Sequence, residues 1–186
     1  SKKLNIEFFF SDIYKEMKKN LLFAFTFLFF LPAVYSKNIN FQVVQNNPGF
    51  DTVFAVSNLF EQALSDFFFE SGHIVSNSPV FIKEDSQSDS AELKRALADT
   101  LLGGMDVLVR LEIKYDEKTA NSAGALLPNS VKSVSWQNYN PKTGKIISDG
   151  SIFPEKVDAS NNNETELYKF ASSVAAKVSS TLKSLK

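Results

Sequence analysis

The segment from residue 105 to 115 constrains the fold of this chain more than any other stretch. Charged side chains fill most of its alternate positions, with Leu108 as the exception. The positions between them are apolar: Met105, Val107, Val109, Leu111, Ile113 and Tyr115. A period of two is typical of a β-strand with one buried face and one mostly solvated face. We therefore expect an antiparallel strand or a strand at a sheet edge.

Further segments have strand composition or helical periodicity. Strands are expected at residues 41–45, 73–76, 132–139 and 146–153, with residues 79–82 as an irregular extension of the second. Apolar residues spaced by three or four positions predict helices over 52–71, 91–102 and 164–185. We expect Ser90 to cap the second helix after a polar loop over 85–90, and Asn163 or Thr165 to cap the third.

The expected order of elements is therefore β-α-β-α-β-β-β-α. Right-handed crossovers should place the connecting helices on one face of the sheet. A turn over residues 140–144 should join the last two strands as an antiparallel hairpin. The predicted fold class is α/β: a two-layer sandwich of a mixed sheet of about five strands with three helices, forming one domain over residues 37–186.

A secretory signal precedes this expected domain. Met17 is followed by two lysines, and residues 21–31 form an apolar run. Val34 and Ser36 occupy the third and first positions before Lys37, where a signal peptidase requires small or modest side chains. We expect cleavage between Ser36 and Lys37 and export of the remaining chain.

Two other interpretations of residues 17–36 stay open, a transmembrane anchor and a buried core helix. An anchor needs about 20 apolar residues to span a bilayer, whereas the run from residue 21 to 34 has 14. Residues 1–16 are expected to be an upstream extension, with the true start at Met17. A genuine extended leader is the alternative.

Charge and cysteine content exclude several functional classes. From Lys37 onward the chain has 15 Lys and Arg against 18 Asp and Glu, a net charge of −3. No basic surface therefore indicates a nucleic-acid partner. The chain has no cysteine, which excludes disulfides, thiolate metal sites and the lipid-modified cysteine of bacterial lipoproteins.

No group of residues predicts catalysis, so we expect no enzymatic activity, no cofactor and no metal. His73 is the only histidine, and its place between a helix and a strand favours a structural or solvated role. Glycines 103–104 precede a strand, which is the reverse of the order in a phosphate-binding loop. Asp85, Asp89 and Asp99 lack the spacing of a calcium loop.

Phe67, Phe68 and Phe69 form the one stretch that suggests an interaction surface. A helix of this kind buries one face, so three adjacent rings cannot all point into one core. Phe68 and Phe69 are therefore candidate interaction residues. The alternative places Phe67 and Phe68 in the core and Phe69 at its rim.

Three spaced motifs follow one another along the chain. They are Phe60, Leu64, Phe67, Gly72 and Val75; then Gly104, Asp106, Leu108 and Val109; then Thr143, Gly144 and Ile146. In this order they resemble the bacterial envelope family that includes CsgG, LpoB and the N-terminal domain of TolB. The resemblance implies an anticodon-binding-like α/β domain in the periplasm or at the outer membrane. It implies no catalytic residue, because these members scaffold, activate or secrete.

The chain departs from that family by lacking the lipobox cysteine and CsgG's pore-forming insertions. We expect a non-enzymatic periplasmic or envelope domain that binds or scaffolds a protein partner, without a transmembrane span after processing. A surface-exposed or secreted interaction protein is the alternative, and protease treatment of intact cells separates the two. An unrecognised hydrolase that uses Asp or Ser residues is a third hypothesis.

Overall fold

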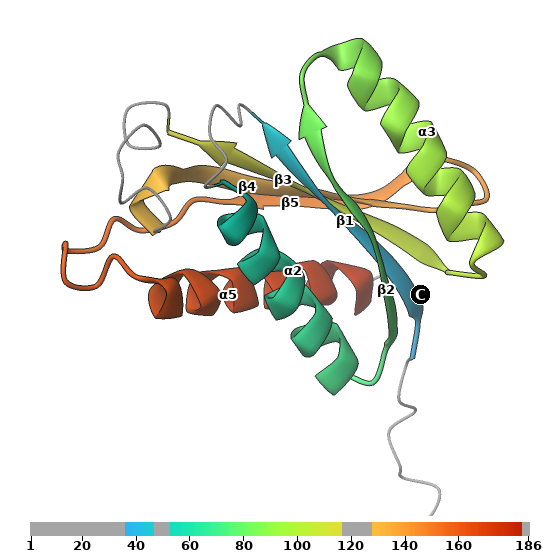
Figure 1. Cartoon of the computed structure of the whole chain (residues 1–186). Helices are drawn as coiled ribbons and strands as arrows, with labels where there is room; N and C mark the ends of the chain where they lie inside the picture. The colour runs from blue at the N-terminus through green and yellow to red at the C-terminus, as the bar shows by residue number, and fades with distance from the viewer. Residues whose placement is uncertain (1–35, 47–52, 117–127, 184–186) are drawn as a thin grey trace, which may run out of the picture. The chain divides into compact units, whose positions relative to one another are not determined.

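A mixed five-stranded sheet forms the centre of the protein in a computed structural model, which describes residues 36–46, 53–116 and 128–183 (Figure 1). The strand order is β2-β1-β3-β4-β5. The strands are β1 (Asn38–Asn46), β2 (Ile74–Lys83), β3 (Val107–Tyr115), β4 (Val131–Tyr139) and β5 (Ile146–Ile152). β1 is parallel to β2 and β3, whereas β4 is antiparallel to both β3 and β5.

Three helices complete the fold: α2 (Val53–Glu70), α3 (Ser86–Leu102) and α5 (Glu164–Lys183). A short 3-10 helix, η1 (Pro128–Ser130), precedes β4. The α/β class, the mixed sheet of five strands with three helices and the element order are confirmed. The predicted signal segment and residues 1–16 lie outside the described residues except for Ser36, as do most of the predicted loop over 119–129 and Leu185.

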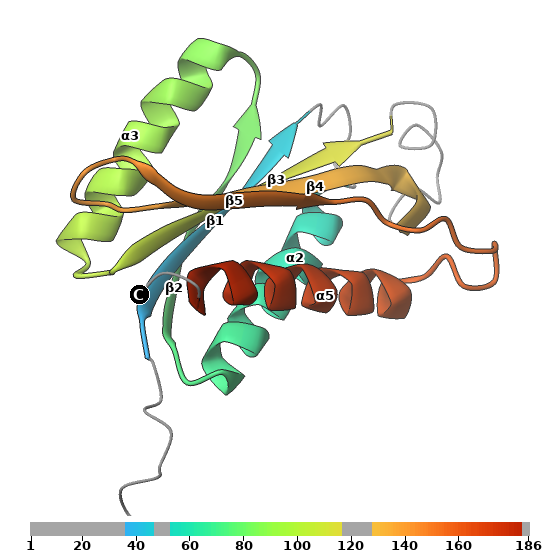
Figure 2. The same ribbon diagram turned by 180° about the vertical axis from the view of Figure 1, so that it is seen from behind.

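The prediction that the connecting helices share one face is wrong. Helices α2 and α5 cover one face of the sheet and α3 covers the other, as the two views show (Figures 1 and 2). The reason lies in the strand order. From β1 the chain crosses to β2 on one side, and from β2 it crosses back over β1 to β3. Right-handed crossovers in opposite directions place their helices on opposite faces.

The prediction of an antiparallel strand holds for one side of β3, which is antiparallel to β4 and parallel to β1. The alternative of a sheet edge is wrong, because β3 lies in the middle of the sheet between β1 and β4. Its predicted apolar face is buried against α2 and α5, within the main core. Its second face is partly covered by α3, where Leu108 packs with Ala96 and Tyr139 in a smaller core. Leu108, the exception to the alternation, marks this second covered face.

The polar segment over 85–90 is the first turn of α3, not a loop, so Ser90 does not cap this helix. The Asp85 side chain accepts a hydrogen bond from the Ser88 amide at 2.7 Å, and the Ser88 hydroxyl accepts one from the Asp85 amide at 3.2 Å. This reciprocal pair is a capping box, which satisfies two amides that the start of a helix leaves without a partner.

The predicted cap of α5 is confirmed at Asn163, whose side-chain oxygen accepts a hydrogen bond from the Glu166 amide at 3.0 Å. Replacing Asn163 with alanine should lower the free energy of unfolding by about 1 kcal/mol, because the Glu166 amide loses this acceptor. For a chain of this size that corresponds to a melting temperature about 2–4 °C lower. Thermal unfolding measures the change, and an unchanged melting temperature would contradict the cap. Exposed Asn161 offers a matched control, for which an alanine variant should unfold as the unaltered protein does.

Candidate functional site

The phenylalanine triplet lies in the last turns of α2, and its three rings have different surroundings. Phe68 is fully buried in the main core, and Phe67 packs partly buried against that core. Phe69 is 74% exposed. Successive helical residues are rotated by about 100°, so the ring after Phe68 leaves the buried face. As a candidate interaction residue, Phe68 is thus corrected to a core residue, and Phe69 remains on the surface.

His73 is buried where α2 leads into β2. Its Nδ1 accepts a hydrogen bond from the Lys37 backbone amide at 3.1 Å. Its ring meets the ring of Phe68 edge to face, with centroids 6.3 Å apart. A histidine held in this way fixes the start of β1 against the end of α2, which is a structural role. Ser36 and Lys37, the predicted cleavage residues, therefore lie directly before β1.

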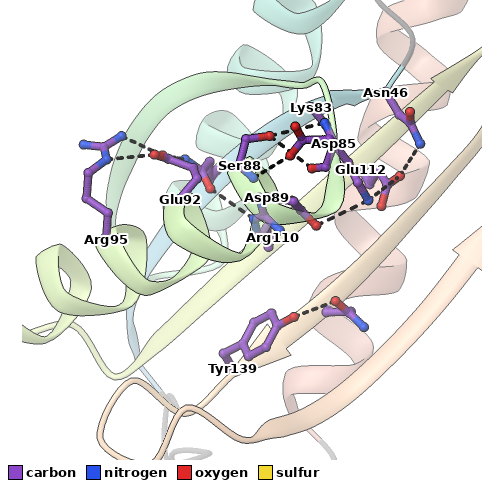
Figure 3. Close-up of polar contacts among 12 residues, drawn as sticks. Asn46, Lys83, Asp85, Ser88, Asp89, Glu92, Arg95, Arg110, Glu112 and Tyr139 are labelled. Carbon is purple, nitrogen blue, oxygen red and sulfur yellow. Dashed lines mark hydrogen bonds and ion pairs between the residues drawn. The ribbon is translucent and has the colours of Figure 1, made fainter.

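A network of charged side chains connects α3 to the sheet face below it (Figure 3). At its centre the guanidinium of Arg110 donates to Asp89 at 2.7 Å and to the Gln42 side-chain oxygen at 3.2 Å. The guanidinium carbon also lies 5.8 Å from the centroid of the Phe81 ring. The Arg110 side chain is only 9% exposed, so its charge depends on these partners.

Further ion pairs extend the network on both sides. Lys83 contacts Asp89 at 3.3 Å and Glu112 at 3.5 Å. On α3, the Arg95 guanidinium contacts Glu92 at 2.6 Å. Glu92 in turn accepts a hydrogen bond from the Gln42 amide nitrogen at 2.6 Å. The network therefore ties α3 to both β1 and β3.

Two carboxylates of this network, Asp89 and Glu92, have a pKa below the ordinary value. Burial raises the pKa of Asp89, but the hydrogen bond and charge of Arg110, with a smaller contribution from Lys83, bring it below its ordinary value. The hydrogen bond from Arg95 lowers the pKa of Glu92, against an opposing effect of burial. A carboxylate with a lowered pKa is a poor proton donor near neutral pH. The arrangement suits a structural clamp better than acid–base chemistry.

Beside this network, the sheet face has a polar hollow of about 310 Å³. Its lining comes from four neighbouring strands and consists of Val44, Arg110, Glu112, Ser135, Trp136, Gln137, Asp149, Gly150 and Ser151. Glu112 is already occupied, since it accepts a hydrogen bond from Asn46 at 2.7 Å and pairs with Lys83. The remaining polar lining offers neutral hydrogen-bonding groups and the exposed carboxylate of Asp149 to the solvent.

A second pocket of about 390 Å³ lies between the end of β5 and the first turns of α5. Most of its lining is apolar: Pro128, Ile152, Phe153, Pro154, Val157 and Phe170, with Glu155, Glu166, Lys169 and Ser173 completing it. Phe153 is 70% exposed. A large exposed ring beside an apolar pocket is a common feature of protein interaction sites.

The base of this second pocket is connected to the main core. The rings of Phe170 and Phe60 meet edge to face, with centroids 6.0 Å apart, and Phe60 is fully buried. Such pairs fix the orientation of both rings. On the rim, Glu166 is paired with Lys169 at 2.6 Å, whereas Glu155 is exposed. The pocket thus has an apolar side that continues into the main core and an exposed acidic side chain in its lining.

Sequence reasoning missed this pocket because its lining comes from three separate segments. Phe153 was expected as the last residue of a strand, but β5 ends at Ile152. The one local signal is a large apolar residue directly before Pro154, since proline cannot continue a ladder of hydrogen bonds. Among residues 36–46, 53–116 and 128–183, no group of acidic or histidine side chains could hold a metal ion. Within the same ranges, no helix is long and apolar enough to cross a membrane.

Comparison with protein families gives one match, a family model described as "Uncharacterised protein", over residues 38–183. No curated protein matches the chain. Among solved structures, the PelC dodecamer from Paraburkholderia phytofirmans is 12% identical, with 79% of this chain and 87% of that chain covered and a TM-score of 0.41. Lipoprotein GNA1162 from Neisseria meningitidis is 15% identical, with 77% and 99% covered and a TM-score of 0.41.

TolB from Acinetobacter baumannii is also similar, at 12% identity and a TM-score of 0.38. The match covers 78% of this chain and 28% of TolB. TolB, one of the proteins named in the sequence resemblance, is thus among the similar structures. At these identities the three comparisons describe an arrangement of strands and helices and nothing further.

Proposed function

Because the chain belongs to the family described as "Uncharacterised protein", we propose its function from its own surface: a non-enzymatic, periplasmic protein-binding domain of the bacterial envelope. The observation that carries this proposal is the apolar pocket beside exposed Phe153. An apolar lining gains binding energy when it is covered by a partner. It offers few groups for making or breaking bonds.

The chemistry of the pocket defines the kind of partner it fits. Its base takes an apolar side chain, and its rim carries the exposed carboxylate of Glu155. Glu166 is already paired with Lys169, so Glu155 is the rim carboxylate best placed to attract a cation. The expected occupant is an apolar residue of another protein, with a lysine or arginine close to it in the same segment.

Replacing Phe153 with alanine should weaken this association by about tenfold or more, because exposed aromatic rings at the centre of an interface contribute most of its binding energy. The fold should be unaffected, with a change in unfolding free energy within about 0.5 kcal/mol, since Phe153 is mostly exposed. The measurement is crosslinking in living cells from a photoreactive amino acid at Lys156, an exposed residue next to the pocket, with and without the Phe153 substitution.

Leu102 offers a matched control, because it is 86% exposed at the end of α3, on the other face of the sheet. The Leu102→Ala variant should crosslink as the unaltered protein does. Glu155→Lys should weaken the same crosslink by reversing the charge at the rim. A crosslink that persists in Phe153→Ala and is lost in Phe69→Ala would contradict the pocket and place the interaction at the end of α2.

A further inference from the structure

We propose that the fold contains a binding site for its own processed amino terminus: the α-ammonium group of Lys37, formed by cleavage after Ser36, docks against His73 between α2 and β2, while the Lys37 side chain contacts the C-terminal end of α5. This inference rests on the predicted cleavage position and is independent of the pocket beside Phe153. It assigns a role to the only histidine of the chain.

Three hydrogen bonds hold Lys37, the residue at which the mature chain is expected to begin. Its backbone nitrogen donates to His73 Nδ1 at 3.1 Å, and its carbonyl accepts from the Ile74 amide at 3.0 Å. Its side-chain Nζ donates to the carbonyl oxygen of Leu182, near the end of α5, at 3.0 Å. Most first residues of a domain are poorly held. Lys37 is instead held through its backbone and its side chain.

His73 is built to accept a hydrogen bond from this position. The ring is 6% exposed, and its orientation is fixed by the edge contact with Phe68. The backbone nitrogen of His73 also donates to the Phe68 carbonyl at 3.0 Å. A ring whose Nδ1 accepts a hydrogen bond carries no proton on that nitrogen. The neutral imidazole therefore presents a lone pair to the Lys37 nitrogen, whether that nitrogen belongs to an amide or to an amine.

Two sources of negative charge lie near this position. The last carbonyl groups of a helix carry a partial negative charge, and the end of α5 lies within reach of Lys37, as its bond to Leu182 shows. The carboxylate of Asp106 accepts a hydrogen bond from the Asn38 amide at 2.9 Å, one residue along the chain from Lys37. Burial lowers the pKa of the Lys37 side chain, and the nearby charge of Asp106 opposes that effect.

Cleavage changes the group that this site holds. Hydrolysis breaks the C–N bond between Ser36 and Lys37, and water supplies the hydroxyl group for Ser36 and a hydrogen for the new amine. At neutral pH the new carboxyl group of Ser36 releases its proton, and the amine takes up one proton to become an ammonium. The uncleaved chain presents a neutral amide with one hydrogen, whereas the cleaved chain presents an ammonium with three at neutral pH. One of the three hydrogens keeps the hydrogen bond to His73 Nδ1, and the added charge lies near Asp106 and the end of α5. Since Ser36 is exposed, its removal uncovers no core.

The first test compares two forms of the chain from residue 37 to 186, which lies within one compact unit, Tyr35–Lys186. One form has a free α-amine and the other is acetylated on the Lys37 nitrogen, which keeps a hydrogen-bond donor and removes the charge. At pH 7 the free form should melt about 2–4 °C higher. Equal melting temperatures, or a mature chain from cells whose amino terminus is any residue other than Lys37, would overturn the proposal.

The second test measures access to the amine without altering the core. An amine-acylating reagent should modify the α-amine of the folded chain beginning at Lys37 about tenfold more slowly than that of a chain beginning at Ser36, whose amine lies in solvent. Equal rates would overturn the proposal. If His73→Gln, which keeps an acceptor, preserves the slow rate and His73→Ala loses it, the histidine is the docking group. A slow rate in a folded His73→Ala chain would overturn that assignment.

Discussion

Replacing Phe68 with alanine is expected to lower the free energy of unfolding by about 3–5 kcal/mol, which is the usual cost of removing a buried aromatic ring. Phe68 has no exposed surface and lies in the main core between the sheet and α2. Its ring also contacts Phe67 and His73, with centroids 6.5 and 6.3 Å away. The alanine variant would leave a cavity that these neighbours fill only in part.

Phe69 provides the matched control for this prediction, since it differs by one position along the same helix. Its ring is 74% exposed, so Phe69→Ala should change the unfolding free energy by no more than about 0.5 kcal/mol. Urea denaturation of both variants measures the contrast, with equal slopes expected if the unfolded states are alike. A small effect for Phe68→Ala would mean that this ring is not part of the core.

The contrast between Phe68 and Phe69 shows how far the spacing of apolar residues predicts burial along a helix. The spacing of apolar residues in 52–71 predicts the buried face, and a rotation of about 100° per residue requires one ring of the triplet to leave it. The alternative that placed Phe67 and Phe68 in the core agrees with their observed burial. The pattern did not determine which face of the sheet the helix covers, because that depends on the position of a strand elsewhere in the chain.

Local sequence likewise predicts which residues of a strand are buried but not where the strand lies in the sheet. The alternation over 105–115 predicted the buried residues of β3, because a period of two is a local property of a strand. The central position of β3 depends on pairing with β1 and β4, which are distant in sequence. Arg110 was expected on a mostly wet face, yet its side chain is 9% exposed because α3 lies over it. Within this segment, Leu108 is the one residue that indicates this cover.

The candidate site was less predictable than the fold for a related reason. Its pocket combines η1, the end of β5 and the first turns of α5, and no local pattern relates these segments. The polar residues 85–90 were expected to form a loop because such residues are common in turns. In the folded chain these residues cap and begin α3. The same side chains suit a turn or the start of a helix, and the packing of the helix decides between the two structures.

Replacing Asp89 with leucine should lower the free energy of unfolding by about 3 kcal/mol, since breaking one partner of a buried ion pair leaves the other without compensation. Arg110 would keep its hydrogen bond to Gln42 at 3.2 Å but lose the carboxylate at 2.7 Å. The value lies at the low end of the usual range because the Asp89 side chain retains 22% exposure.

The reverse change, Arg110→Met, should cost less, about 1–2 kcal/mol. Asp89 would then keep Lys83 at 3.3 Å and its partial exposure. The double variant, with both substitutions, should recover most of the loss, because an apolar pair of similar volume often matches a buried ion pair in stability. Chemical denaturation of the four proteins gives the coupling energy. Additive effects of the two substitutions would contradict a direct pair.

Acidity provides an independent test of the same pair. The folded-state pKa of Asp89 lies below its ordinary value because the charges of Arg110 and Lys83 outweigh the effect of burial. An aspartate with a lowered pKa stabilises the fold fully above its unfolded pKa of about 3.9, and this contribution is lost as the pH falls through the folded pKa. The unaltered protein should therefore lose stability below about pH 4 more steeply than the double variant. Parallel curves for the two proteins in that range would show that Asp89 does not stabilise the fold through its charge.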